Sequence, residues 1–303
     1  MTRRVLAGVL LIAFAACASA KSPDPVRVHL NGVDLTYIEE GAGEPVLLLH
    51  GGLGDYTSWQ PQMEPFAKHY RVISYSRRYS YPNRNPAPPA DYSVTTDVAD
   101  LAALIGSLHL RNVRLVGQSY GGSIALVFAT RYPTAVHSMV LSEPPAHELV
   151  RSVAGGEAAY QAFIGTVWIP AGDSFRKGDT QQAMRTFMNG LAGGDRFDGL
   201  PTEVRDAALR NAPSMRALAL SADPFGGVAQ QQLQQLRVPT LIVTGENTIQ
   251  IHKMVNAQLV RLLAGAEAVT ISKAGHGSPR DNPADYNEAA LRFFRMASIN
   301  SSP

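Results

Sequence analysis

Residues 113–130 read VRLVGQSYGGSIALVFAT, a short buried strand joined to a buried helix by a turn of small residues. The turn carries the pattern Gly117-x-Ser119-x-Gly121. A chain that passes from strand to helix at one residue crowds its neighbours, so small residues are needed on both sides of the serine. This stretch therefore predicts a strained turn that raises the Ser119 hydroxyl above a helix N-terminus, whose dipole favours developing negative charge.

Short apolar strands alternate with helical patterns on both sides of this turn. Asn31-Gly32 joins the first two strands and is a strong hairpin signal. The later strands are continuous apolar runs, as expected of strands buried on both faces of a parallel sheet. The sequence predicts an α/β fold with an eight-stranded, mostly parallel sheet flanked by helices. We expect strands near residues 26–30, 33–39, 46–49, 71–75, 113–117, 136–142, 238–244 and 267–271, and helices near 59–68, 94–108, 120–131, 252–263 and 284–296.

One long interval after the sixth strand contains helical patterns and no convincing strand. A structureless loop of this length is improbable in a compact domain. We therefore expect residues 146–235 to form a helical cap, inserted between two parts of a core domain at 21–145 and 236–303.

The N-terminus has the pattern of a secretory signal peptide. Arg3 and Arg4 precede a short apolar run, and Ala18-Ser19-Ala20 forms an A-x-A cleavage site. The run is too short to span a bilayer, which needs about 20 apolar residues. We expect export after removal of residues 1–20; cleavage and lipidation at Cys17 is the alternative.

Removal of the leader changes the overall balance of the chain. Two of the 27 Lys and Arg residues and none of the 25 Asp and Glu residues lie in it, so the remainder carries no net formal charge. The single cysteine also leaves with it, which excludes a disulfide, a thiol nucleophile and a cysteine metal site. No basic stretch with interleaved aromatic residues indicates nucleic-acid binding. We expect a small-molecule substrate, no cofactor and no metal; nothing in the sequence gives the oligomeric state.

A glycine-rich segment, His50-Gly51-Gly52-Leu53-Gly54, follows the third strand. Acyl transfer needs two backbone N–H donors near the oxyanion. We expect Gly52 to supply one donor, with Leu53 as the alternative, and Tyr120 to supply the other. His50 is interpreted as a structural residue that packs this loop.

The last strand is followed by Gly275-His276-Gly277. A general base must reach the serine hydroxyl, so it must lie at the same edge of the sheet. His276 meets this condition. The other histidines on strands or helices, His252 among them, are interpreted as ordinary surface or core residues. His147, near the cap entrance, could touch the substrate but is interpreted as a solvated loop residue.

With these motifs in this order, the chain resembles the α/β-hydrolase superfamily, in its branch with a serine nucleophile and a cap after the sixth strand. The resemblance covers nearly all of residues 26–297. It implies that Ser119 is the nucleophile and His276 the base, with Gly52 and Tyr120 forming the oxyanion hole. A serine at this turn implies an acyl-enzyme, whereas haloalkane dehalogenases and cap-bearing epoxide hydrolases use an aspartate there.

The chain departs from the superfamily at Thr248, where most members have the catalytic aspartate. Two carboxylates can take its place. Glu246 lies on the same turn, and Glu143 follows the sixth strand, where some members of the superfamily hold their acid. Glu143 is preferred because Pro144-Pro145 gives it a rigid exit; Glu246 remains the alternative.

The function expected from these features is hydrolysis of a carboxylic ester or lactone. Carbon–carbon bond hydrolysis, a haloperoxidase-like activity on the same triad and a ligand-binding pseudo-hydrolase are the alternatives. Arg77 and Arg78 are expected to anchor their loop or to pair with acids such as Asp97 and Asp100. Trp168 is expected to pack within the cap and can line the pocket.

Overall fold

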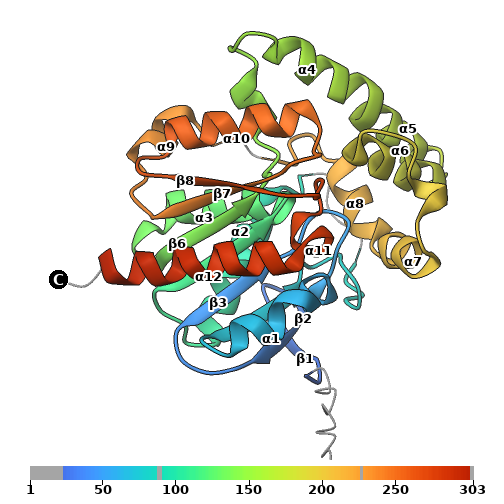
Figure 1. Ribbon diagram of the computed structural model, residues 1–303. Helices are drawn as coiled ribbons and strands as arrows, with labels where there is room; N and C mark the ends of the chain where they lie inside the picture. The colour runs from blue at the N-terminus through green and yellow to red at the C-terminus, as the bar shows by residue number, and fades with distance from the viewer. Residues whose placement is uncertain (1–22, 87–90, 226–227, 301–303) are drawn as a thin grey trace, which may run out of the picture.

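Within residues 23–86, 91–225 and 228–300, which the computed structural model describes, eight strands form a single sheet (Figure 1). The expected leader and Cys17 lie outside these residues. The strands are β1 (Val26–Leu30), β2 (Val33–Glu40), β3 (Pro45–Leu49), β4 (Arg71–Ser76), β5 (Val113–Gln118), β6 (Val136–Ser142), β7 (Thr240–Gly245) and β8 (Glu267–Ile271).

The sheet is mostly parallel, as predicted. Its order is β1-β2-β4-β3-β5-β6-β7-β8. β1 pairs antiparallel with β2, and β2 pairs antiparallel with β4. The other neighbouring pairs, β4–β3, β3–β5, β5–β6, β6–β7 and β7–β8, are parallel. The carboxyl ends of β3 and of β5 to β8 therefore meet at one edge, where the loops that follow these strands can form a site.

Helices cover both faces of the sheet. Alternate strand side chains point to opposite faces, so Leu47 and Leu49 join one core cluster while Val46 and Leu48 join the other. The first cluster is covered by α2 (Val94–Ser107), α3 (Tyr120–Arg131) and α10 (Gln250–Leu262). The second is covered by α1 (Gln60–Ala67) and α12 (Pro283–Asn300).

The described chain between β6 and β7 is helical and contains no strand. Figure 1 shows α4 to α8 gathered beyond one end of the sheet. The predicted boundaries of a cap at 146–235 and its role in substrate choice remain predictions. The helices of this interval are α4 (Gly156–Phe163), α5 (Ile169–Arg176), α6 (Thr180–Ala192), α7 (Thr202–Arg210), α8 (Ala212–Ala219) and α9 (Gln230–Gln235), with a 3-10 turn at His147–Val150 and a π-helical turn at Ile164–Trp168.

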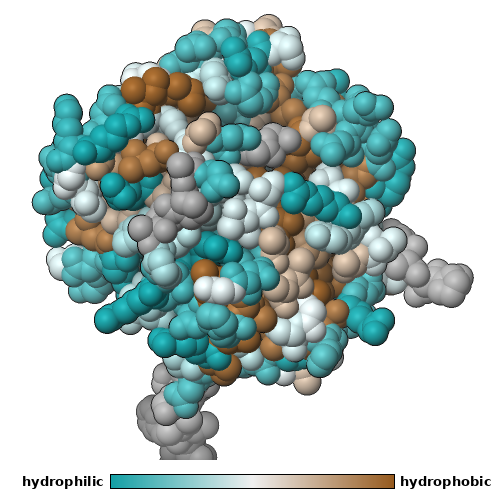
Figure 2. Space-filling view, turned by 180° about the vertical axis from the view of Figure 1, so that it is seen from behind, coloured by the Kyte–Doolittle hydropathy of each residue, from teal (hydrophilic) through white to brown (hydrophobic). Residues whose placement is uncertain are grey.

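Element boundaries differ from the predicted ones by a few residues. β7 begins at Thr240 rather than at residue 238, because Pro239 has no N–H to give to a neighbouring strand. On the face shown in Figure 2, hydrophobic residues are scattered among hydrophilic ones. None of the helices in the described part of the chain is both long and apolar enough to cross a membrane.

Candidate active site

The turn between β5 and α3 is strained at the serine. Ser119 has φ 52° and ψ −123°, which is unusual for a residue with a side chain. Its N–H donates a 2.7 Å hydrogen bond to the carbonyl of Ser142, which ties the turn to the neighbouring strand. A Cβ atom on Gly117 would lie 2.6 Å from the carbonyl oxygen of Gly121, and one on Gly121 would collide with the carbonyl of Leu49. The two glycines of the motif are therefore required by close packing.

Glu143 lies beside His276. The distance from Nδ1 of His276 to Oε2 of Glu143 is 2.7 Å. The other carboxylate oxygen, Oε1, accepts a 2.8 Å hydrogen bond from the N–H of Gly245. The side chain of Glu143 is fully buried, and its backbone has a φ of 49°. Such a left-handed conformation is strained for glutamate and is typical of functional positions.

The charge state of Glu143 follows from its surroundings. Burial raises the pKa of its carboxyl group, but the neighbouring side chains of His252 and His276 outweigh this effect and hold the pKa well below its usual range. The carboxylate is therefore ionised at neutral pH, as a partner of an imidazole base must be.

The alternative acid, Glu246, has a different set of contacts. Its side chain is exposed, and Oε2 accepts a hydrogen bond of 2.8 Å from the N–H of Lys273. Thr248, at the position of the usual aspartate, donates its hydroxyl proton to Oε2 of Glu143 at 2.7 Å. The structure brings Glu143 to His276, while Glu246 bridges the turn to the loop after β8.

Ser119 and His276 line the same cavity. Nε2 of His276 is buried and has no hydrogen-bond partner among the described residues. The Nδ1 proton points to Glu143, so Nε2 carries the lone pair that can accept a proton. Nε2 of Gln118 donates a hydrogen bond of 3.1 Å to the carbonyl of His276 and thereby links the serine turn to the histidine loop.

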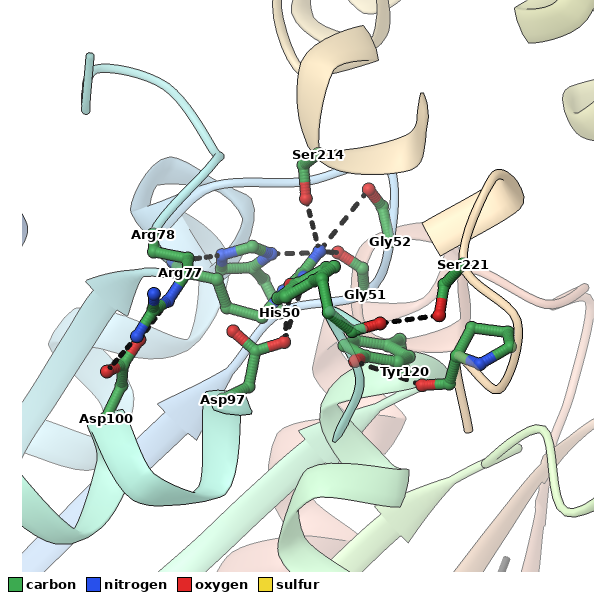
Figure 3. Close-up of polar contacts among 12 residues, drawn as sticks. His50, Gly51, Gly52, Arg77, Arg78, Asp97, Asp100, Tyr120, Ser214 and Ser221 are labelled. Atoms are coloured by element: carbon green, nitrogen blue, oxygen red, sulfur yellow. Dashed lines mark hydrogen bonds and ion pairs between the residues drawn. The ribbon is translucent and has the colours of Figure 1, made fainter. Parts of the chain in front are cut away.

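The carbonyl groups of the loop after β3 are held by His50 and Arg77 (Figure 3). The N–H of Arg77 donates to Nε2 of His50 at 3.1 Å, so the His50 proton is on Nδ1, which donates to the carbonyl of Gly51 at 2.8 Å. Nη2 of Arg77 lies 3.4 Å from the carbonyl oxygen of Gly51 and 3.5 Å from that of Gly52. In a trans peptide the N–H points opposite to the C=O. These contacts therefore direct the N–H groups of Gly52 and Leu53 away from Arg77.

The same contacts agree with the structural role expected of His50. Burial, followed by the nearby charge of Arg77, lowers the pKa of His50 to about 3, so the ring is neutral. The guanidinium of Arg77 also lies 4.6 Å from the centre of the Tyr120 ring.

Among the described residues, the N–H groups of Gly52, Leu53 and Tyr120 donate no hydrogen bond to another protein group. All three residues line the cavity, where a substrate oxygen can reach them.

The two arginines after β4 pair with the expected acids. Arg77 is buried and lies 3.5 Å from Asp97, and its Nη2 also donates to the hydroxyl of Ser214 in α8 at 2.8 Å. Arg78 contacts Asp100 at 2.6 Å. Figure 3 shows the guanidinium of Arg77 among several protein partners and that of Arg78 against Asp100. Their role as loop anchors is therefore supported by the contacts.

A cavity of about 790 Å³ lies above Ser119. Trp168 lines it and also packs against Phe187 and Phe225, with ring centres 5.3 and 5.0 Å apart. The cavity is large enough for a drug-sized ligand. Apolar side chains from the helices between β6 and β7 form much of its wall, namely Phe163, Trp168, Phe187, Met188, Met215 and Leu218.

The sequence-based interpretation of His147 was wrong, and that of His252 was incomplete. His147 is buried, not solvated, because it packs against Phe163 with ring centres 4.7 Å apart. His252 is a core residue, as allowed, but Nδ1 also lies 3.2 Å from Oε2 of Glu143. Its ring stacks on that of His276, with centres 4.3 Å apart and planes 27° apart. Thr248 and His252 lie four residues apart where the chain enters α10, but this spacing alone does not show that either of them meets Glu143.

Glu143, His252 and His276 also form a group that could hold a metal ion. Their ligand atoms lie within 4.8 Å of one another. The distances of 2.7 and 3.2 Å from the two Nδ1 atoms to Oε2 are those of direct contact between acid and imidazole. A metal here would have to replace the His276–Glu143 hydrogen bond, so the arrangement fits an acid–base pair better than a metal centre.

Comparison with known proteins shows the family of the chain. Residues 44–283 match the family described as alpha/beta hydrolase fold. The chain is 24% identical to a 2-hydroxy-6-oxo-6-(2'-aminophenyl)hexa-2,4-dienoic acid hydrolase from Metapseudomonas resinovorans, over 90% of this chain and 91% of that protein. It is 35% identical to a 2-hydroxy-6-oxo-2,4-heptadienoate hydrolase from Pseudomonas putida over a shorter segment, which covers 38% of this chain and 42% of that protein.

A solved structure, a bromoperoxidase from Bacillus anthracis, superimposes with a TM-score of 0.71 at 25% identity, over 90% of this chain and 100% of that chain. The family match spans well over half of the chain, and both curated relatives are hydrolases. The chain therefore belongs to the alpha/beta hydrolase fold family, and it is a hydrolase.

Proposed function

We propose that this protein is an exported serine hydrolase that cleaves a carboxylic ester or lactone through an acyl-enzyme. In this mechanism Ser119 is the nucleophile, His276 the general base and Glu143 the acid. The observation that carries the proposal is the 2.7 Å contact between Nδ1 of His276 and Oε2 of Glu143, in a cavity that Ser119 also lines. Export is inferred from the leader pattern of residues 1–20.

The first half-reaction forms the acyl-enzyme. Oγ of Ser119 attacks the carbonyl carbon of the substrate while Nε2 of His276 takes the hydroxyl proton. Glu143 keeps the other imidazole proton on Nδ1 and stabilises the imidazolium. The negative oxygen that forms accepts hydrogen bonds from the N–H groups of Gly52, with Leu53 as the alternative, and Tyr120. His276 then protonates the leaving alcohol.

The second half-reaction returns the enzyme to its starting state. Water loses a proton to Nε2 of His276 and attacks the acyl carbon. The tetrahedral intermediate collapses, Ser119 regains its proton, and the acid is released. The helices of residues 146–235 act as a cap whose apolar side chains, such as Trp168 and Met188, select the substrate.

Carbon–carbon bond hydrolysis is the second candidate, and it is favoured by the relative from Metapseudomonas resinovorans that matches over 90% of this chain. The test is turnover by the wild type and by Ser119→Ala of p-nitrophenyl esters of graded acyl length, aliphatic lactones and a vinylogous 1,5-diketone acid. We expect ester or lactone hydrolysis with a kcat/KM at least tenfold above that for the diketone acid, and we expect Ser119→Ala to abolish it. Faster cleavage of the diketone acid would assign the second function, and full activity of folded Ser119→Ala would contradict an acyl-enzyme.

A further inference from the structure

Helix α10 contributes a second histidine to the buried carboxylate, and the proposed mechanism does not use it. The side chain of His252 is 1% exposed. Nδ1 lies 3.1 Å from the hydroxyl of Thr248 and 3.2 Å from Oε2 of Glu143. An imidazole buried beside an acid and a hydroxyl has a defined hydrogen-bond state, which can be worked out from the available protons.

The Thr248 hydroxyl has one proton to give. Glu143 is ionised and can only accept, so the 2.7 Å contact between Oγ1 of Thr248 and Oε2 of Glu143 uses that proton. Toward His252 the same hydroxyl can therefore only accept. The proton of His252 must be on Nδ1, which donates to Oγ1 of Thr248 at 3.1 Å.

The result is a chain of donors that ends on the carboxylate. His252 donates to Thr248, Thr248 donates to Oε2 of Glu143, and Nδ1 of His276 donates to the same oxygen from the other side. Oε1 is held by the N–H of Gly245. The carboxylate cannot rotate toward or away from His276 without breaking one of these bonds.

The ring of His252 also backs the ring of His276. The two planes are 27° apart with their centres 4.3 Å apart, and the ring of His147 also stacks on that of His252, with centres 5.9 Å apart. Burial, followed by the nearby charge of His276, lowers the pKa of His252 to about 4. His252 is thus neutral at neutral pH and does not compete with His276 for the charge of Glu143.

We propose that His252 is a positioning residue of this active site: through the Thr248 hydroxyl it holds Oε2 of Glu143 in line with Nδ1 of His276. The inference rests on the proposed function, because it concerns the acid of that triad. It also gives a reason for threonine at position 248, where the superfamily has its aspartate: the acid has moved to β6, and the vacated position now supports it.

The test separates the hydrogen bond from the ring. His252→Asn keeps a donor, since the Asn side-chain amide nitrogen corresponds to Nδ1 of histidine, but removes the ring. His252→Phe keeps a ring but removes the donor. Thr248→Val removes the hydroxyl at nearly constant volume, and Thr248→Ser retains it. For each variant kcat, KM and the free energy of unfolding in urea are measured with an ester that the wild type cleaves.

We expect His252→Phe and Thr248→Val each to lower kcat about tenfold, on the scale of one hydrogen bond to a charged group, with KM changed less than about twofold. His252→Asn and Thr248→Ser should restore most of the loss. The double variant Thr248→Val/His252→Phe should be no slower than Thr248→Val alone, because both substitutions break the same chain of donors.

Asn256→Leu is the matched control. Asn256 lies one turn further along α10, is buried, and donates to the carbonyl of Val243 and the hydroxyl of Thr244, away from Glu143. Its replacement should lower the free energy of unfolding and leave kcat of the folded enzyme near that of the wild type.

A His252→Phe enzyme with the kcat of the wild type would overturn the inference. It would also be overturned if the fold-reduction in kcat of the double variant equalled the product of the reductions in His252→Phe and Thr248→Val. If His252→Phe does not fold, the pair Thr248→Val and Thr248→Ser decides, because equal kcat values for the two would also overturn it. The proposed function is checked separately with Ser119→Ala in the same assay: activity of that variant would remove the triad itself, whereas an inactive Ser119→Ala with an unaffected His252→Phe would remove only the role of His252.

Discussion

The hydroxyl of Thr248 lies 2.7 Å from Oε2 of Glu143, so the residue after β7 binds the carboxylate that follows β6. In most of the superfamily that the chain resembles, the residue at position 248 is itself the acid. Here the carboxylate comes from the neighbouring strand, and both strand ends lie at the same edge of the parallel sheet. The acid of the proposed triad can therefore come from β6 and still reach the histidine after β8.

Replacing each candidate acid by its amide tests this assignment. Glu143→Gln keeps the size of the side chain but removes its charge, so we expect kcat to fall by about 10⁴-fold, as when another triad loses this charge. Glu246→Gln should change kcat less than about twofold, because Glu246 bonds to the N–H of Lys273. Steady-state kinetics on one ester gives both values, and the opposite ranking would assign the acid to Glu246.

A rescue experiment follows from the contact between Thr248 and Glu143. In the Glu143→Gln background, Thr248→Asp should recover part of the lost kcat, because it puts a carboxylate back at the superfamily position, beside the side chain it replaces. Thr248→Asn in the same background has the same size without the charge and should recover nothing. Equal activities of the two double variants would show that the carboxylate at 248 does not reach His276.

The fold was predicted from the sequence nearly completely, because it depends on local patterns. Continuous apolar runs marked the parallel strands, and the small residues around Ser119 marked the turn. The sequence favoured Glu143 over Glu246 but could not decide between them, because the choice depends on which side chain points inward from its turn. His252 was missed for a similar reason: helical spacing alone does not show which buried face meets a carboxylate.

The burial of His147 predicts a pH-dependent stability. Burial, followed by the charges of His252 and His276, lowers the pKa of His147 to about 3, whereas an unfolded histidine has a pKa of about 6.5. Below pH 6.5 the unfolded state binds a proton that the folded state does not. The contribution of His147 to the free energy of unfolding is therefore complete above pH 6.5 and is lost as the pH falls toward 3. Between pH 6.5 and pH 5, the free energy of unfolding of His147→Phe should fall by about 2 kcal/mol less than that of the wild type.

Urea unfolding at pH 7 and pH 5 measures this difference. The control is His69→Phe, since the side chain of His69 is exposed and lies outside the cavity. A His147→Phe protein whose stability falls between these pH values as steeply as that of the wild type would show that His147 is not held neutral.

The serine turn should tolerate no added side chain. A Cβ atom on Gly121 would collide with the carbonyl of Leu49, which is backbone of the central strand and cannot move aside. We expect Gly121→Ala to unfold the protein or to lower its free energy of unfolding by several kcal/mol, about the size of a severe core clash. Gly106→Ala, in α2, meets no atom within 4 Å and should be neutral or stabilise by about 1 kcal/mol. Thermal unfolding of both variants checks this, and equal effects would contradict it.

The helices between β6 and β7 should govern substrate choice. Trp168 and Met188 line the cavity, so Trp168→Ala and Met188→Ala should change the ratio of kcat/KM values for long and short acyl esters by about tenfold, the scale of one or two buried methylene groups. Ile169→Ala is the control, because Ile169 is exposed beside Trp168 and lies outside the cavity. A uniform loss on all esters would exclude a selective role for these two residues.

The most direct test of the account is the site and stoichiometry of covalent labelling by a fluorophosphonate. Intact-mass and peptide mass spectrometry of the labelled protein should find one adduct per chain, located on Ser119, with none in Ser119→Ala and a much slower reaction in Glu143→Gln. An adduct on another residue, or an unlabelled wild type that still hydrolyses its ester, would contradict the assignment of Ser119 as the nucleophile of a serine hydrolase.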